Sequence, residues 1–325
     1  MYIVSYSETY NRIIRSLNSI KWFENWSIDK IFIDNHIRSK LFTDELKKLI
    51  EKKDFTAKGC INLCKPLLDE LSIDDCPSDW MNYIYQYTLN KNFSEAITIT
   101  LSDKLAAPCE IYLRIFNVLC ETEKNASDES WQSQYPMNFL TLEEENELEY
   151  PSEYRKFVKA FNDNYTYEMM KINGELTGFT TLDHVCGVHY LSLYIARQLK
   201  SIGLTVDLGR VSGAAGGHDI GKYGCKGIEL RRVPHLHYYY TDQWFKRYEI
   251  NYIRNIAINH STWDLELENL SLESLLLIYS DFRVKDEAHN GIKQMKLFSL
   301  EDAFHVILDK LENVDDEKSS RYKKV

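Results

Sequence analysis

From residue 152 onward, apolar residues recur at intervals of three and four positions and hardly ever alternate with polar ones. This period is typical of α-helices that bury one face, and it leaves little of the chain for a sheet. We therefore expect the C-terminal half to be built of packed helices. They are predicted at residues 153–170, 182–200, 207–217, 238–248, 250–259, 272–284 and 300–311.

Residues 1–140 show the same helical spacing in shorter stretches, so the whole chain is assigned to the all-α class. Two short strands are expected in this half, at residues 2–4 and 97–101. The helical stretches are 9–18, 43–52, 81–87 and 109–122.

An acidic cluster at residues 143–149, ending at Pro151, marks the predicted domain boundary. With 325 residues the chain is long enough for two domains. We expect a mostly helical domain of unknown role at 1–150 and a helical-bundle domain at 151–325. The cluster itself is interpreted as a solvated linker or exposed helix, with a regulatory acidic flap as the alternative.

The pair His218–Asp219 lies in a stretch rich in glycine and alanine, residues 213–222. Adjacent His and Asp side chains reach one metal ion only if the backbone is held tightly, and glycine permits a close approach because it lacks a Cβ. The same composition suits close helix–helix contact in the helix expected at 207–217. Further candidate ligands lie on, or at the ends of, other expected helices: His184, His237, His260 and Asp281.

The mixture of ligand types indicates the kind of metal. Imidazole nitrogens together with carboxylates suit transition metals, whereas carboxylates alone favour magnesium or calcium. We expect one or two divalent ions, namely manganese, iron, zinc or nickel, with magnesium as the alternative. Asp281 ends an apolar run that begins at Leu275, and a carboxylate there is costly to bury unless it meets a cation. That cation is either a metal ion or Lys285, one helical turn away.

Single histidines also serve ordinary structural roles, so alternatives stay open. His184 could cap a helix or lie at the surface, and His260 could satisfy the polar groups of a helix end. The middle ligand is either His235 or His237. We prefer His237 because the apolar pair Trp244-Phe245 then follows it at a helix-compatible distance.

The ordered set His184, His218–Asp219 and Asp281 resembles the HD-domain metal-dependent phosphohydrolase superfamily, an all-helical fold named after its His-Asp pair. The form His-Asp-Ile-Gly-Lys, followed by two further histidines, is similar to the branch that binds two metals. That branch includes the HD-GYP and other cyclic-dinucleotide phosphodiesterases. The resemblance covers about residues 165–290.

Two segments carry the resemblance further. His260-Ser-Thr-Trp263-Asp264 resembles the segment that follows the family's double histidine, and Ile278-Tyr-Ser-Asp281 resembles its terminal aspartate helix. The Gly-Tyr-Pro element that would follow Asp264 is absent, and Asn259-His260 stands where the family has two histidines.

The resemblance implies a phosphoric ester hydrolase, either a phosphodiesterase or a phosphatase, that acts on a nucleotide-like phosphate ester through a metal-activated hydroxide. Two cations lower the pKa of a shared water and neutralise the charge that develops on phosphoryl oxygens. Asp219 and Lys222 are then the catalytic residues. The implied metal ligands are His184, His218, Asp219 and Asp281 for the first ion, and His237 and His260 for the second, with Asp219 bridging.

Charge patterning agrees with an anionic substrate. The chain carries a net charge of −10, which argues against indiscriminate nucleic-acid binding. Residues 220–260, however, hold seven Lys and Arg residues against three Asp and Glu residues. Lys222, one helical turn past His218, is the first candidate for contacting a phosphate, and the looser candidates are Arg231, Arg232 and Arg254, with Lys246. The aromatic run at 238–240 either stacks a nucleobase or, as we prefer, belongs to the core.

The remaining features concern the compartment and the competing functions. Seven scattered cysteines are typical of reduced intracellular thiols, and the chain contains neither a secretion signal nor an apolar run of membrane-spanning length. We therefore expect a cytoplasmic protein that has no membrane contact and binds a phosphate-containing small molecule. One alternative is an HD-type nuclease acting on single-stranded nucleic acid within a larger protein, with further domains beyond residue 325. Another is a non-catalytic module that senses a nucleotide.

Overall fold

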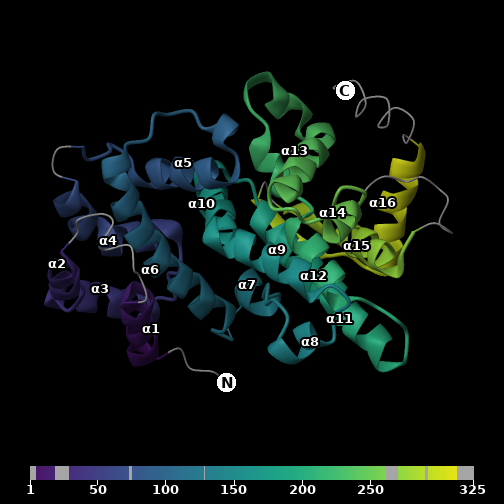
Figure 1. Cartoon of the computed structure of the whole chain (residues 1–325), viewed down its shortest axis with the longest axis horizontal. Coiled ribbons are helices and arrows are strands. Elements are labelled where there is room, and N and C mark those ends of the chain that lie inside the picture. The colour runs from purple at the N-terminus through teal and green to yellow at the C-terminus, as the bar shows by residue number, and fades with distance from the viewer. Residues whose placement is uncertain are drawn as a thin grey trace. The chain divides into compact units, whose positions relative to one another are not determined.

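The computed structural model describes residues 5–18, 29–72, 75–127, 129–260, 270–289 and 292–312. Within these ranges the chain forms sixteen α-helices, a few 3-10 turns and one two-stranded sheet (Figure 1). The predicted all-α fold class is therefore confirmed. The expected strand at 2–4, the segment 261–264 and the charged C-terminal tail lie outside the described residues. Throughout the described ranges, every helix is too short or too polar to cross a membrane.

The chain divides into two compact units that interleave along the sequence. The first consists of Met1–Lys91, Ile97–Gln134 and Tyr165–Phe179, and the second of Asn92–Ala96, Tyr135–Asn164 and Thr180–Val325. These units are defined by contacts between residues and not by independent folding, so the predicted boundary near residue 150 stays a prediction.

The first unit is organised around α6 (Ala106–Lys124), whose central residues are buried on nearly every side. A helix that is apolar all round belongs inside a bundle, and α6 packs against α1, α4 and α10. The other helices of this unit are α1 (Tyr6–Asn18), α2 (Lys30–Ile37), α3 (Lys40–Glu51), α4 (Ala57–Leu71), α5 (Trp80–Asn92), η3 (Asp103–Leu105), α7 (Trp131–Gln134) and α10 (Thr166–Thr177).

The second unit is organised around α11 (Thr181–Ser201) and α12 (Leu208–Gly217), which pack against each other and against α15 (Leu272–Arg283). A Cβ added to Gly213 would lie 2.7 Å from Ile253, and one added to Gly217 would lie 2.7 Å from Phe245. The expected close helix–helix contact of the Gly/Ala-rich helix is confirmed. The remaining elements are η2 (Ser94–Ala96), α8 (Leu142–Asn146), α9 (Pro151–Asp163), η4 (Ile220–Gly224), η5 (Gly227–Arg232), α13 (Val233–Arg247), α14 (Tyr252–Ala257), β1 (Val284–His289), β2 (Ile292–Leu297) and α16 (Leu300–Glu312).

The acidic cluster predicted near residue 145 is bound by cations of the second unit. Glu144 accepts two hydrogen bonds from the Arg197 guanidinium, at 2.7 and 3.0 Å, and Glu147 pairs with Lys200 at 2.7 Å. Both cations belong to α11. The carboxylates of α8 therefore fasten this short helix to α11, the helix that carries His184.

Two of the predicted elements are wrong. Residues 97–101 form no strand, because their neighbouring backbone donors are satisfied by side chains: Thr98 N–H donates to Gln86 Oε1 and Ser102 N–H donates to the Tyr83 hydroxyl. The helix predicted at 153–170 is broken at Tyr165, which has the left-handed φ of 51°. The chain ends α9 there and begins α10, which belongs to the other unit.

The hairpin β1–β2 was not predicted. Its strands pair antiparallel, with Val284 opposite Leu297 and Lys285 opposite Lys296. The strand β1 follows α15 directly and contacts α11. The hairpin therefore begins immediately beside the helix that carries Asp281.

Candidate metal centre

Six side chains predicted as metal ligands converge inside the second unit. His184 lies in the first turn of α11, and His218 and Asp219 follow α12. His237 belongs to α13, His260 comes shortly after α14, and Asp281 belongs to α15. All six are buried, with 8% exposure or less. Residues separated by almost a hundred positions thus meet at one place.

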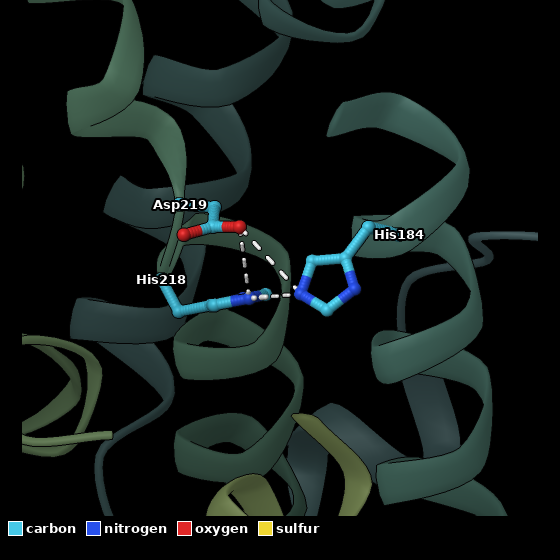
Figure 2. A group of neighbouring side chains, drawn as sticks. All are labelled: His184, His218 and Asp219. Atoms are coloured by element: carbon cyan, nitrogen blue, oxygen red, sulfur yellow. Dashed lines mark hydrogen bonds and ion pairs between the residues drawn. The ribbon is translucent and has the colours of Figure 1, made fainter. Parts of the chain in front are cut away.

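The first group consists of His184, His218 and Asp219 (Figure 2). His184 Nε2 lies 3.3 Å from His218 Nε2 and 3.6 Å from Asp219 Oδ2, and His218 Nε2 lies 3.5 Å from that same oxygen. Asp281 reaches this group through His184, since its Oδ1 is 2.9 Å from His184 Nε2. The group therefore offers two nitrogens and two carboxylates.

The second group shares Asp219 and adds His237 and His260. Asp219 Oδ1 is 3.5 Å from His237 Nε2, which is in turn 3.5 Å from His260 Nε2. The two oxygens of one carboxylate thus face different groups. In each group the potential ligand atoms all lie within 4.8 Å of one another, a spacing at which one ion can contact all of them.

The four histidines share one hydrogen-bond arrangement. Each Nδ1 lies within hydrogen-bonding distance of a main-chain carbonyl oxygen, and because a carbonyl only accepts, Nδ1 carries the proton. Each neutral ring therefore presents Nε2 as a lone pair toward Asp219 or its neighbours. The acceptors are Val284 O for His184 (2.8 Å), Ala215 O for His218 (2.8 Å), Val233 O for His237 (2.9 Å) and Ala257 O for His260 (2.5 Å).

This arrangement fits a cation. With Nδ1 protonated, the close Nε2 pairs His184–His218 and His237–His260 bring lone pairs together instead of a donor and an acceptor. Such contacts are repulsive unless a positive charge lies between them. Histidines that ligate metals usually donate their other ring N–H to a carbonyl or carboxylate, which fixes the tautomer. The groups formed by His184, His218, Asp219, His237 and His260 can therefore hold a metal ion.

Burial favours the neutral form of three of the imidazoles. Loss of solvent lowers the pKa of His184 and His260, and it lowers the pKa of His237 to about 4. Burial alone would raise the pKa of Asp219, but the ammonium of Lys222 outweighs it and holds that pKa well below its ordinary value. Neutral imidazoles beside an ionised carboxylate are the protonation states that metal binding requires.

Each carboxylate also meets a lysine. Lys222 Nζ lies 2.5 Å from Asp219 Oδ2, and Lys285 Nζ lies 3.1 Å from Asp281 Oδ1. Lys222 was predicted at this site. Lys285 had been weighed only as a rival partner for Asp281, yet Asp281 contacts both Lys285 and His184. Lys285 is therefore a cation partner of Asp281 in the structure, and the role of Asp281 as a metal ligand stays a prediction.

The backbone around the pair explains the glycine at position 221. A Cβ there would lie 2.0 Å from His237 O and 2.3 Å from Thr241 N, both of them main-chain atoms of α13. Gly221 N–H donates to Thr241 Oγ1, which in turn donates to His218 O. Glycine therefore lets η4 pack directly on α13, and this contact brings His237 within reach of Asp219.

The other predicted phosphate contacts belong to η5, α13 and α14. Arg231 is exposed and Arg232 half-buried in η5, and the Arg254 guanidinium lies 3.6 Å from Asp242 Oδ1. Lys246 also pairs with Asp242, at 2.6 Å. The expected role of these residues as phosphate contacts stays a prediction.

Two further outcomes concern α13. His237 is the buried member of the ambiguous pair, whereas His235 is half-buried and belongs to neither group. The Tyr238 ring packs against two imidazoles, with centroids 3.8 Å from His237 and 4.9 Å from His260. Tyr238 is therefore a neighbour of the second group, which the sequence prediction of a core aromatic run had not identified.

Comparison of the chain with protein family models, with curated proteins and with solved structures finds no match in any of the three. The resemblance to the HD-domain superfamily accordingly stays a prediction drawn from the residues. What the fold itself supplies is a helical bundle in which buried histidines and aspartates form two groups around Asp219, each able to hold a metal ion.

Proposed function

We propose that this chain is a divalent-metal-dependent phosphoric ester hydrolase of the HD type, acting on a nucleotide-like phosphate ester. The observation that carries the proposal is the orientation of four buried imidazoles, each fixed through Nδ1 so that Nε2 faces the groups that share Asp219. A purely structural cluster would not need four lone pairs turned inward around one carboxylate.

His184, His218, Asp219 and Asp281 would hold a first ion, and Asp219, His237 and His260 a second. Bound divalent cations lower the pKa of a coordinated water and neutralise charge on phosphoryl oxygens. The protein's own contribution is to keep these ligands deprotonated and fixed. The mixed nitrogen and oxygen ligands favour manganese, iron, zinc or nickel over magnesium.

Lys222 is the proposed phosphate contact of the site. Its side chain is 21% exposed and that of Asp219 is 3% exposed, so a substrate arriving from solvent would reach Lys222 more easily than the carboxylate. An ammonium hydrogen bond to a phosphate oxygen is charge-assisted and stronger than one between neutral groups. Lys222 would therefore hold the ester beside Asp219.

Asp219→Ala tests the proposal, because this carboxylate belongs to both groups. We expect the variant to lose bound metal and to lose turnover of chromogenic phosphate monoesters and diesters together. Asp163→Ala is the matched control, since Asp163 is exposed on α9 and pairs only with surface Lys159 in the contacts described. It should retain both metal and turnover.

The substrate panel separates the alternatives. It contains nucleotides, single-stranded DNA and RNA, each assayed with manganese. Cleavage of single strands but not of nucleotides would indicate a nuclease. Stoichiometric metal without turnover of any ester would indicate a non-catalytic module. A fully active Asp219→Ala protein would refute the proposed mechanism.

A further inference from the structure

Each of the two carboxylates of the centre pairs with a lysine that follows it closely in the sequence. Lys222 follows Asp219 by three residues, and Lys285 follows Asp281 by four. The two buried carboxylates are thus matched by two ammonium groups, and burial lowers the pKa of His184, His237 and His260, which favours their neutral form. The charges of the two lysines and the two aspartates cancel before any cation enters.

Asp281 Oδ1 cannot serve a lysine and a metal equally well. The oxygen lies 3.1 Å from Lys285 Nζ and 2.9 Å from His184 Nε2, so an ion shared with His184 would sit close to the ammonium. Two positive charges at such a separation repel strongly in a poorly solvated site. A divalent ion held there would compete with the ammonium for the carboxylate, and the ammonium would then have to move.

The position of Lys285 allows its side chain to move. It is the second residue of β1, and its side chain is 24% exposed while that of Asp281 is 6% exposed, so the lysine is the more accessible member of the pair. The lysine stem is flexible and its ammonium can reorient without rearranging the backbone. The ammonium contacts Asp281 and lies 5.5 Å from the centroid of the Phe282 ring. Because the Val284 carbonyl is bonded to His184, the backbone here is tied to the centre, and a movement of the ammonium would change side-chain contacts.

We propose that Lys285, together with Lys222, exchanges its carboxylate partner for phosphate oxygens when the centre takes up a divalent ion. This inference rests on the proposed function and adds Lys285 as a second phosphate-binding residue. In the absence of metal the two lysines keep the carboxylates satisfied. With metal bound they add positive charge at the entrance, and the ligand that fits is an anionic phosphate group.

The test compares Lys285→Met with Lys296→Met. Lys296 lies opposite Lys285 in the hairpin register and is exposed beside Glu287, so it controls for loss of a lysine from the same sheet. Calorimetry first measures manganese binding to each metal-free protein and then binding of inorganic phosphate to each manganese-loaded protein. For Lys285→Met we expect manganese affinity equal to or higher than wild type. Phosphate affinity should be about tenfold weaker or more, because a tenfold loss corresponds to about 1.4 kcal/mol, close to the lower value for a charged hydrogen bond. Lys296→Met should match wild type in both.

A second readout uses the wild-type protein and does not depend on how the variant folds. Reductive methylation followed by peptide mass spectrometry reports how accessible Lys285 is. We expect faster methylation of Lys285 with manganese present and protection when phosphate is added. Absence of manganese binding to the wild type would defeat the proposed function and this inference together. Normal manganese binding with unchanged phosphate affinity in Lys285→Met, or unchanged methylation, would defeat the inference alone.

Discussion

Replacing His237 with glutamine should make the metal-free protein less sensitive to acid. The His237 ring is 4% exposed, and burial lowers its pKa from 6.5 to about 4. In the unfolded chain the same ring is solvated and titrates near 6.5. Between these two pH values the unfolded state binds a proton that the folded state does not. Glutamine is polar and of similar size but does not titrate in this range.

The direction and the size of the effect on the free energy of unfolding follow from this difference in pKa. A group whose folded pKa is depressed contributes stability that is complete above its unfolded pKa and is lost as pH falls toward its folded pKa. For His237 the two pKa values differ by about 2.5, which corresponds to about 3 kcal/mol at about 1.36 kcal/mol per pKa unit. About 2 kcal/mol of this is lost between about pH 7 and pH 4.5. His184 and His260 shift in the same direction and add to the wild-type sensitivity, but they remain in the variant.

Urea unfolding of chelator-treated protein measures the effect. Free energies of unfolding are compared at about pH 7 and pH 4.5 for wild type and His237→Gln. The wild type should lose about 2 kcal/mol more than the variant over this range. His305→Gln, at an exposed position of α16, is the control and should follow the wild type. Equal losses in wild type and His237→Gln would show that the ring is not held neutral by burial.

Two further substitutions probe packing and a second buried acid. Gly221→Ala places a Cβ 2.0 Å from His237 O, so we expect manganese binding to be lost and the free energy of unfolding to fall by about 3 kcal/mol or more. Gly174→Ala is the control, because its Cβ would meet its nearest atom at 3.5 Å, and it should leave manganese binding intact. Burial raises the pKa of Glu168 despite a 2.7 Å hydrogen bond from Asn117. The free energy of unfolding of the wild type should therefore fall, relative to that of Glu168→Gln, as pH rises from the ordinary glutamate pKa through the raised one. Parallel pH profiles of the two proteins in urea unfolding would contradict this.

The helical class was accessible from local apolar spacing, whereas the candidate ligands were accessible through the His218–Asp219 pair and the family resemblance that its ordered partners carry. Apolar residues at intervals of three and four positions predict helices. Burying the Asp281 carboxylate in an apolar run costs free energy, and this cost predicts a cation beside it. The preference for His237 over His235 also came from helical spacing, and His237 is the one that joins a group. The close approach of the Gly/Ala-rich helix followed from the absence of Cβ atoms.

The differences between prediction and structure have different physical sources. The break at Tyr165 follows the polar run Asn162-Asp163-Asn164, but Tyr165 itself lacks the conformational freedom of glycine, and the two helices that it separates pack in different units. The hairpin β1–β2 had a local signal, since Asn290-Gly291 separates its strands in the sequence and this dipeptide is typical of tight hairpin turns. In the basic segment, charge alone does not indicate that the Arg254 guanidinium lies near Asp242.

The two groups differ in the carboxylates that the described residues offer. The first group draws on two imidazoles and two carboxylates, whereas among the described residues the second has two imidazoles and the Asp219 carboxylate that it shares with the first. Asn259, which precedes His260, donates its side-chain amide to Asn255 O and so turns back onto its own helix end. Ions in both groups would each depend on Asp219, so the shared carboxylate would couple the occupation of one group to that of the other.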